Sequence, residues 1–237
     1  MRLDKLLSDM GYGSRREVKI VLKRQQVKVN GVFPKSASIH VDPEVDEVLV
    51  NGERVVYKPL VYLMMNKPAG VISATEDKRD QTVIDLVDEA FSYYDLHPVG
   101  RLDKDTVGLL ILTNDGKLSH ELLSPKKHVP KTYYAKIDGI VTEEDVNAFD
   151  EGINVNDEYT TLPAQLKILK SGELSEIEVT IYEGKYHQVK RMFIARGKEV
   201  VYLKRLAMGQ LQLDETLEEG MSRELTEEEL DLLQNRE

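Results

Sequence analysis

The order of strand-like and helix-like segments beyond Pro59 restricts the fold of this chain more than any other feature. Apolar and β-branched residues typical of strands fill residues 60–66, 131–137, 163–169, 175–182 and 200–206. Segments typical of helices are residues 83–91, 117–123, 142–149, 186–196 and 226–234. Because the strands follow one another in pairs, without regular β-α-β alternation, this order favours an α+β fold with a mainly antiparallel, mixed sheet.

The chain before Pro59 has the pattern of a smaller helix–helix–hairpin unit. Apolar residues spaced by three and four over residues 3–10 predict a short helix. Ser14 and Glu17 have the spacing of a capping box and begin a second helix. Asn30-Gly31 then favours a tight hairpin turn. A domain boundary is therefore expected near Pro59.

The predicted domains are residues 1–58 and residues 59–237, and charge is distributed unevenly between the two ends of the chain. Residues 1–40 contain nine basic and three acidic side chains, whereas residues 214–237 contain ten acidic and two basic ones. The net charge of −10 is thus weak evidence against a polyanionic partner, because the sum conceals a basic head and an acidic tail.

Arg15, Lys19 and Lys23 are spaced by four in the second helix and form a basic stripe on one helix face. Such a stripe is most often simply a solvated helix face. Together with the capping box, the hairpin and the charge asymmetry, it also suits an RNA-binding surface.

Several classes of protein are disfavoured by what the sequence lacks. The chain has no cysteine, no window of 18 uncharged apolar residues and charges where a signal peptide would be apolar. We therefore expect no membrane association and a cytosolic location. The five histidines show no metal-ligand spacing, and no glycine-rich phosphate loop is present, so neither a metal nor a cofactor is expected.

Four segments combine charged and aromatic residues in a way that indicates chemistry. They are NKPAGVIS (66–73), GRLDKDTVGLLILTNDG (100–116), KTYYAK (131–136) and EGKYHQVKRMF (183–193). In the second, Arg101 and Asp103 are two residues apart and point the same way on an extended segment. In the third, Lys131 and Tyr133 share one face of a strand.

These segments, in this order, resemble the RsuA/RluB/RluE/RluF family of pseudouridine synthases over nearly the whole chain. GRLDKDT followed by GLLILTNDG is the long and specific part of the match. The first sixty residues similarly resemble an RNA-binding domain of the ribosomal S-four type. The resemblance implies an enzyme that isomerises a specific uridine in ribosomal RNA. It favours small-subunit (16S) RNA, with large-subunit RNA as the alternative.

The resemblance also implies roles for individual residues. Asp103 would be the nucleophile, Tyr133 the aromatic that stacks on the flipped base, and Lys190 the cation paired with Asp103. Arg191 is the alternative partner, and Arg101 would support the flipped nucleotide or fill the gap it leaves. The residues expected to bind RNA are Arg2, Lys5, Arg15, Arg16, Lys19, Lys23, Lys67, Arg101, Lys131 and Arg191.

Two other classes of function stay open at this point. One is a non-catalytic RNA-binding or ribosome-assembly protein, and the other is a hydrolase that uses Asp103 and Asp105 with a metal. Otherwise Asp105 is expected to be structural, satisfying loop amides or Arg101, and His187 to be structural or RNA-facing. The expected partner is ribosomal RNA or a ribosomal assembly particle, and the expected oligomeric state is a monomer.

Overall fold

The computed structural model describes residues 1–234, and the last three residues of the predicted acidic tail lie outside the described residues. The chain divides into two compact units: Met1–Val61 with Asp88–Asp95, and Tyr62–Val87 with the chain from Leu96 onward. The boundary expected near Pro59 stays a prediction. No pattern in the sequence indicated that the segment 88–95 packs with the first unit, where the Tyr94 hydroxyl donates to the carbonyl of Lys58 (2.8 Å).

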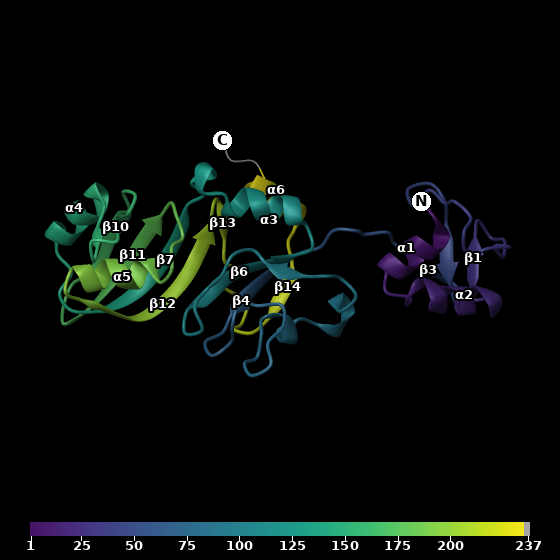
Figure 1. Cartoon of the computed structure of the whole chain (residues 1–237), viewed down its shortest axis with the longest axis horizontal. Helices are drawn as coiled ribbons and strands as arrows, with labels where there is room; N and C mark the ends of the chain where they lie inside the picture. Colours follow the sequence, from purple (N-terminus) through teal and green to yellow (C-terminus); the bar gives the residue numbers. More distant parts are fainter. Residues whose placement is uncertain (235–237) are drawn as a thin grey trace. The chain divides into compact units, whose positions relative to one another are not determined.

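The first unit packs two helices against a small antiparallel sheet (Figure 1). Its elements are α1 (Leu3–Asp9), α2 (Arg15–Lys23), β1 (Val27–Val29), β2 (Val48–Val50) and β3 (Glu53–Arg54). The predicted apolar face of α1 forms the core of this unit, since Leu3, Leu6 and Leu7 are all buried. Burying such a stripe is what holds a short helix in place.

The capping box and the tight turn predicted in the first unit are both present, but the strand before the turn does not pair as it would in a hairpin. The Ser14 side chain accepts from the Glu17 N–H (3.4 Å) and the Glu17 carboxylate accepts from the Ser14 N–H (2.8 Å), which is the predicted capping box. Asn30 and Gly31 form a tight turn with positive φ. The strand before this turn, however, pairs with the distant β2 rather than with a strand that follows the turn directly.

The second unit is built on one mixed sheet with the order β10-β11-β7-β12-β6-β4-β14, to which β5 and β13 add at β6 and β12. The sheet strands are β4 (Tyr62–Lys67), β5 (His97–Pro98), β6 (Val107–Thr113), β7 (Lys131–Asp138), β10 (Gln165–Lys170), β11 (Leu174–Ile181), β12 (Glu199–Met208), β13 (Leu211–Gln212) and β14 (Ser222–Glu224). A separate hairpin joins β8 (Asn154–Val155) to β9 (Tyr159–Thr160). This arrangement confirms the predicted α+β fold with a largely antiparallel sheet.

Strand β6 is buried along its whole length, which explains why the aliphatic run after Asp103 lacks the alternation of a half-exposed strand. It lies between β4 and β12 in the sheet. Its pairing with β12 is parallel, whereas the other ladders of this sheet within the described residues are antiparallel.

The helices of the second unit are α3 (Gly116–Leu123), α4 (Glu143–Glu151), α5 (Gln188–Ala195) and α6 (Glu227–Gln234), and they confirm four of the five predicted ones. Figure 1 shows α4 and α5 at the end of the sheet formed by β10, β11 and β7, and α3 and α6 near β13. None of the helices within residues 1–234 is long and apolar enough to span a bilayer.

The fifth predicted helix, over residues 83–91, is wrong. This segment forms two separate 3₁₀ turns, η1 (Ile84–Leu86) and η2 (Glu89–Phe91), and η3 (Pro125–Lys127) is a third such turn. The backbone is extended at Val87, and the Asp88 side chain accepts from the Ala90 N–H (2.8 Å). An aspartate that bonds a nearby amide favours a new start over continuation of a helix.

Candidate active site

The loop that carries Asp103 lies directly before β6 and is fastened by Lys67 at the end of β4. The Lys67 side chain is fully buried and donates to the carbonyl oxygens of Pro68 (2.9 Å), Lys104 (3.4 Å) and Thr106 (2.9 Å). We expected Lys67 to bind RNA. Its burial corrects this interpretation, because an ammonium with three protein acceptors has no N–H left for a phosphate.

Burial lowers the pKa of Lys67 to about 8, while the charges of Asp105 and Asp103 act in the opposite direction. This pKa lies above neutral pH, and three carbonyl acceptors match the three N–H groups of the charged form. Lys67 therefore supplies both a positive charge near the loop and a fastening point for its backbone.

Two more residues of the 66–73 segment hold the same loop. The Ser73 hydroxyl accepts from the Leu102 N–H and donates to the Leu102 carbonyl oxygen, both at 3.0 Å. The Gly70 N–H donates to the carbonyl oxygen of Lys104 (2.7 Å). The NKPAGVIS segment thus supports the loop, a role that its sequence pattern does not indicate.

Lys190, projecting from α5, joins the two carboxylates of the loop. Its ammonium lies 3.1 Å from Asp103 Oδ2 and 2.7 Å from Asp105 Oδ1. The Asp103 side chain keeps 29 % of its surface exposed, so the carboxylate is accessible as well as paired. Asp105 accepts from a backbone amide of the loop, as expected, and its ion-pair partner is Lys190 rather than Arg101.

The charges of this cluster reinforce one another. Burial acts to lower the pKa of Lys190, but its bonds to Asp105 and Asp103 outweigh that effect and raise the pKa. For Asp105, burial acts to raise the pKa, and the bond to Lys190 outweighs it, so the pKa is lowered. The lysine is accordingly charged and Asp105 ionised at neutral pH.

His187 is a residue of this site that sequence reasoning did not place there. It stands at the position before α5 with a left-handed backbone (φ 49°), and its Nε2 lies 3.5 Å from Asp103 Oδ1. The sequence signal available was its spacing of three from Lys190, which allows both side chains to face the same carboxylate.

Arg191, the alternative partner considered for Asp103, is engaged elsewhere. Its guanidinium lies 2.6 Å from Glu158 Oε2 and 5.5 Å from the centre of the Tyr159 ring. Both contacts connect α5 to the β8–β9 hairpin. The structure thus pairs Asp103 with Lys190, and the expected RNA contact of Arg191 stays a prediction.

Tyr133 lies at the level of the sheet where the Asp103 loop enters β6. Arg205 of β12 pairs with Tyr133 on one side and with Gly108 of β6 on the other. Tyr133 is therefore two strands away from β6, about 10 Å from the strand spacing alone. Its side chain is only 7 % exposed, and its stacking role stays a prediction.

The neighbouring residues of β7 have other partners. The Tyr134 hydroxyl donates to Glu176 Oε2 (2.6 Å), and this bond raises the pKa of Tyr134 to about 12. The Lys131 ammonium donates to the Val129 carbonyl oxygen (2.8 Å), and burial lowers the pKa of Lys131 to about 8. Tyr133 is thus the better candidate of the two tyrosines, since Tyr134 is committed to Glu176.

Arg101, by contrast, is exposed and forms no ion pair with any of the described residues. Within residues 1–234 there is also no group of three histidine, aspartate or glutamate side chains that could hold a metal ion. Asp103 and Asp105 instead share the Lys190 ammonium.

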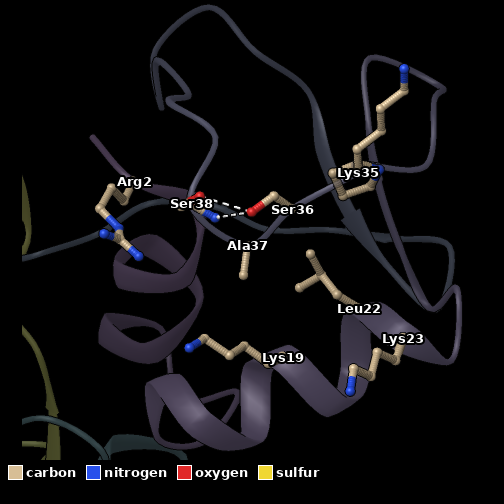
Figure 2. Close-up of a pocket in the computed structure, with 9 residues that line it drawn as sticks. Arg2, Lys19, Leu22, Lys23, Lys35, Ser36, Ala37 and Ser38 are labelled. Atoms are coloured by element: carbon tan, nitrogen blue, oxygen red, sulfur yellow. Dashed lines mark hydrogen bonds between the residues drawn. The ribbon is translucent and has the colours of Figure 1, made fainter.

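A second candidate site lies in the first unit, where cations surround a hollow of about 430 Å³. Three of the predicted RNA-binding residues, Arg2, Lys19 and Lys23, line it, and the loop 34–38 closes it (Figure 2). In Figure 2, Lys19 and Lys23 project from α2. The same wall contains Leu22, so the hollow offers both charge and an apolar surface.

The other predicted cations of this unit lie outside that hollow. Lys5 pairs with Asp9 (2.6 Å) one helical turn away, and Arg2, which does line the hollow, is partly neutralised by Asp4 (2.6 Å). Arg15 and Arg16 are exposed in the first turn of α2. The structure therefore brings three of the six predicted cations of this unit together.

Comparison with known proteins gives the class and then the family. The S4 domain model matches residues 1–46, and the model described as RNA pseudouridylate synthase matches residues 61–195. An RNA-binding unit followed by a sheet with a carboxylate–lysine site defines an RNA-modifying enzyme. The chain belongs to the RNA pseudouridylate synthase family, among the proteins of RsuA/RluB type.

Individual relatives match along their whole length. An uncharacterized RNA pseudouridine synthase of Bacillus subtilis, YtzG, is 54 % identical over 98 % of both chains. Ribosomal small subunit pseudouridine synthase A of Vibrio cholerae is 43 % identical over 97 % of this chain and 98 % of its own. Ribosomal large subunit pseudouridine synthase B of Bacillus subtilis is 40 % identical over 97 % and 93 %. A crystal structure of a pseudouridylate synthase superposes with a TM-score of 0.69 at 39 % identity, covering 98 % of this chain and 99 % of that chain.

Proposed function

We propose that this enzyme converts a specific uridine of ribosomal RNA to pseudouridine with Asp103 as its nucleophile. The observation that carries the proposal is the ion pair of Asp103 with Lys190 at 3.1 Å, formed between a partly exposed carboxylate and a mostly buried lysine. A carboxylate beside apolar neighbours needs such a cation to stay ionised, and an ionised carboxylate is the form that attacks carbon.

The reaction requires little beyond this constellation. The N-glycosidic bond breaks, the uracil rotates while it stays bound, and a new bond forms from the sugar to carbon five. Carbon five gives up its proton to solvent, and N1, no longer bonded to the sugar, takes up a proton. Atoms are conserved, so no redox cofactor or co-reactant enters the balance. Asp103 serves as the nucleophile, and the Lys190 ammonium stabilises the negative charge of the Asp103 carboxylate throughout the reaction.

The uridine must leave its stack to reach Asp103, which costs on the order of a few kcal/mol. We assign Tyr133 to stack on the flipped base and recover about 1–3 kcal/mol of that cost. Arg101, which is exposed beside Asp103 in the sequence, is assigned to support the flipped nucleotide or the gap it leaves. Residues 1–58 would bind the RNA, and residues 59–237 would carry out the reaction.

We propose 16S ribosomal RNA as the substrate, supported by the small-subunit synthase of Vibrio cholerae among the relatives. The large-subunit relative, at 40 % identity, makes 23S RNA the second candidate. Mapping pseudouridines in both RNAs from cells with and without the protein decides between them. A site lost from 16S RNA is expected, and a loss confined to 23S RNA would reassign the substrate. We also propose that the enzyme acts as a monomer in the cytoplasm.

Asp103→Asn is the direct test of the chemistry. This variant should bind ribosomal RNA with the affinity of the unmodified enzyme and form no pseudouridine. Measurable turnover by Asp103→Asn would exclude the nucleophile role, and a wild-type protein without any turnover would favour a purely RNA-binding function. Activity should persist in a chelator, whereas its loss there would favour the metal-dependent hydrolase.

A further inference from the structure

The loop between β11 and α5 presents an aromatic side chain to solvent beside the candidate active site. Tyr186 is 75 % exposed, which is unusual for a large aromatic residue. Its ring lies parallel to that of His187, with 3.8 Å between ring centres and 17° between planes. His187 therefore covers one face of the Tyr186 ring.

This loop is held in place by contacts of its own. The Gln188 side chain accepts from the Lys185 N–H (2.9 Å) and donates to Glu183 Oε1 (2.9 Å). The Lys185 ammonium also lies 3.7 Å from the centre of the Tyr159 ring. Because these contacts already order the loop, a ligand that binds to Tyr186 would lose little free energy in fixing its position.

The pair lies next to the reacting carboxylate. His187 Nε2 is 3.5 Å from Asp103 Oδ1, and the Tyr186 ring stacks on the His187 ring. Only the His187 side chain therefore separates the Tyr186 ring from Asp103, which the target uridine must reach. Lys190 and Arg191 follow on the first turn of α5, where Lys190 is paired with Asp103 and Asp105 and Arg191 with Glu158. Exposed aromatic rings beside cations are what proteins use to hold unstacked RNA bases.

We propose that Tyr186, backed by His187, stacks on a nucleobase of the RNA that flanks the target uridine. Tyr133 is assigned to the target base itself, so Tyr186 adds a second, neighbouring base site. The location of this site rests on the proposed role of Asp103. The base is held equally before and during the reaction, so stacking should affect substrate binding more than the chemical step.

The test measures kcat and KM for tritium release from [5-³H]uridine-labelled ribosomal RNA isolated from cells that lack the protein. Tyr186→Ala and Tyr186→Leu should each raise KM by about 5- to 150-fold, which corresponds to the loss of one base–aromatic stack. Tyr186→Phe keeps the ring and should stay within about 2-fold of wild type in KM. In all three variants kcat should change by less than about 3-fold.

Ile140→Ala is the matched control, since Ile140 is an apolar side chain of the same unit that is 57 % exposed. It should leave both parameters unchanged. Unchanged KM in Tyr186→Ala would overturn the proposal, and so would equal effects of Tyr186→Phe and Tyr186→Ala. If Asp103→Asn retains activity, the proposed mechanism fails independently. If Asp103→Asn is inactive and Tyr186→Ala behaves as wild type, only the flanking-base site fails.

Discussion

Lys190 contacts the carboxylates of both Asp103 and Asp105, so its replacement is the clearest test of the proposed mechanism at the scale of a single residue. Lys190→Met should lower kcat by about 100-fold or more, because it leaves Asp103 without its cation in a partly buried site. Arg191→Met is the neighbouring control and should lower kcat by less than about 5-fold, because Arg191 binds Glu158. Steady-state kinetics on ribosomal RNA checks both. Similar losses in the two variants would refute the assignment of Lys190.

The same ion pairs predict how stability depends on pH. Asp105 has a pKa lowered below its ordinary value of 3.8, so its contribution is present above that pH and lost as the pH falls through the folded-state pKa. Lys190 has a pKa raised above 10.5, so its contribution is present below that pH and lost as the pH rises through the folded-state pKa.

The stability lost in Asp105→Asn should therefore be constant between about pH 5 and 9 and vanish in acid. Because the Asp105 side chain is 73 % exposed, solvent screening limits the difference to about 0.5 kcal/mol. Denaturant titrations of both proteins at a series of pH values measure it. A difference that grows below pH 4 would contradict the lowered pKa.

At this scale, sequence reasoning identified the Asp103–Lys190 pair but not the residues around it. Asp103 and Lys190 follow from the resemblance, and the structure brings them into contact. Lys67 and His187 could not be placed in the same way. Whether a lysine that ends a strand is exposed or buried depends on which loop packs over it, and that loop lies 37 residues away.

Among the elements, β6 and β12 lie side by side at Gly108, where there is no room for a side chain. This residue has φ +100°, and a Cβ atom added to it would lie 2.3 Å from the Arg205 carbonyl oxygen. Gly108→Ala should lower the free energy of unfolding by about 3 kcal/mol or more, because both the backbone conformation and the strand spacing oppose the methyl group.

Gly116→Ala provides the matched control for Gly108→Ala. Gly116 begins α3, and a Cβ atom there would meet nothing within 4 Å. Alanine favours helix, so this variant should be as stable as wild type or slightly more stable. Thermal or denaturant unfolding measures both changes. Equal stability of the two variants would contradict the close approach at Gly108.

Elements with a strong local cause were predictable, and those decided by distant contacts were not. The capping box at Ser14 and the periodicity of α5 depend on residues within a few positions. The segment 83–91 has the apolar spacing of a helix, yet its backbone is extended at Val87 and the Asp88 side chain accepts from the Ala90 N–H, which begins a new turn. The Asn30-Gly31 turn is local, but β1 before it pairs with β2, and no short-range pattern identifies that partner.

For the molecule as a whole, the basic excess of residues 1–40 predicts salt-dependent RNA binding. The double variant Lys19→Glu/Lys23→Glu should weaken binding to ribosomal RNA by about 10-fold or more near physiological salt. It should also reduce the slope of log affinity against log salt by about 1 to 2, and leave kcat at saturating RNA unchanged. Filter binding over a range of salt concentrations measures affinity and slope.

Lys167→Glu/Lys170→Glu is the control with the same change in net charge. Both lysines lie on β10 and are 73 % and 69 % exposed, with weak pairing to Glu178 and Glu176. This variant should bind RNA almost as wild type does. Equal weakening in the two double variants would show that net charge, rather than the hollow lined by Lys19 and Lys23, determines affinity.

The fold class could be predicted at this scale, but not the order of strands in the sheet. Paired strands without regular alternation indicate an antiparallel α+β protein. They do not reveal that β12 lies parallel to β6, a pairing that brings Arg205 between Tyr133 and Gly108. That register depends on contacts between residues almost 100 positions apart.

Lys67, Gly70 and Ser73 all hold the loop before β6 by its main-chain atoms. The backbone of the loop is thus held from outside, while two of its side chains form ion pairs of their own: Lys104 with Asp80 (2.6 Å) and Asp105 with Lys190 (2.7 Å). The place of the Asp103 carboxylate is therefore fixed chiefly by contacts that the segment 67–73 makes to backbone atoms, and these contacts do not depend on which side chains the loop carries.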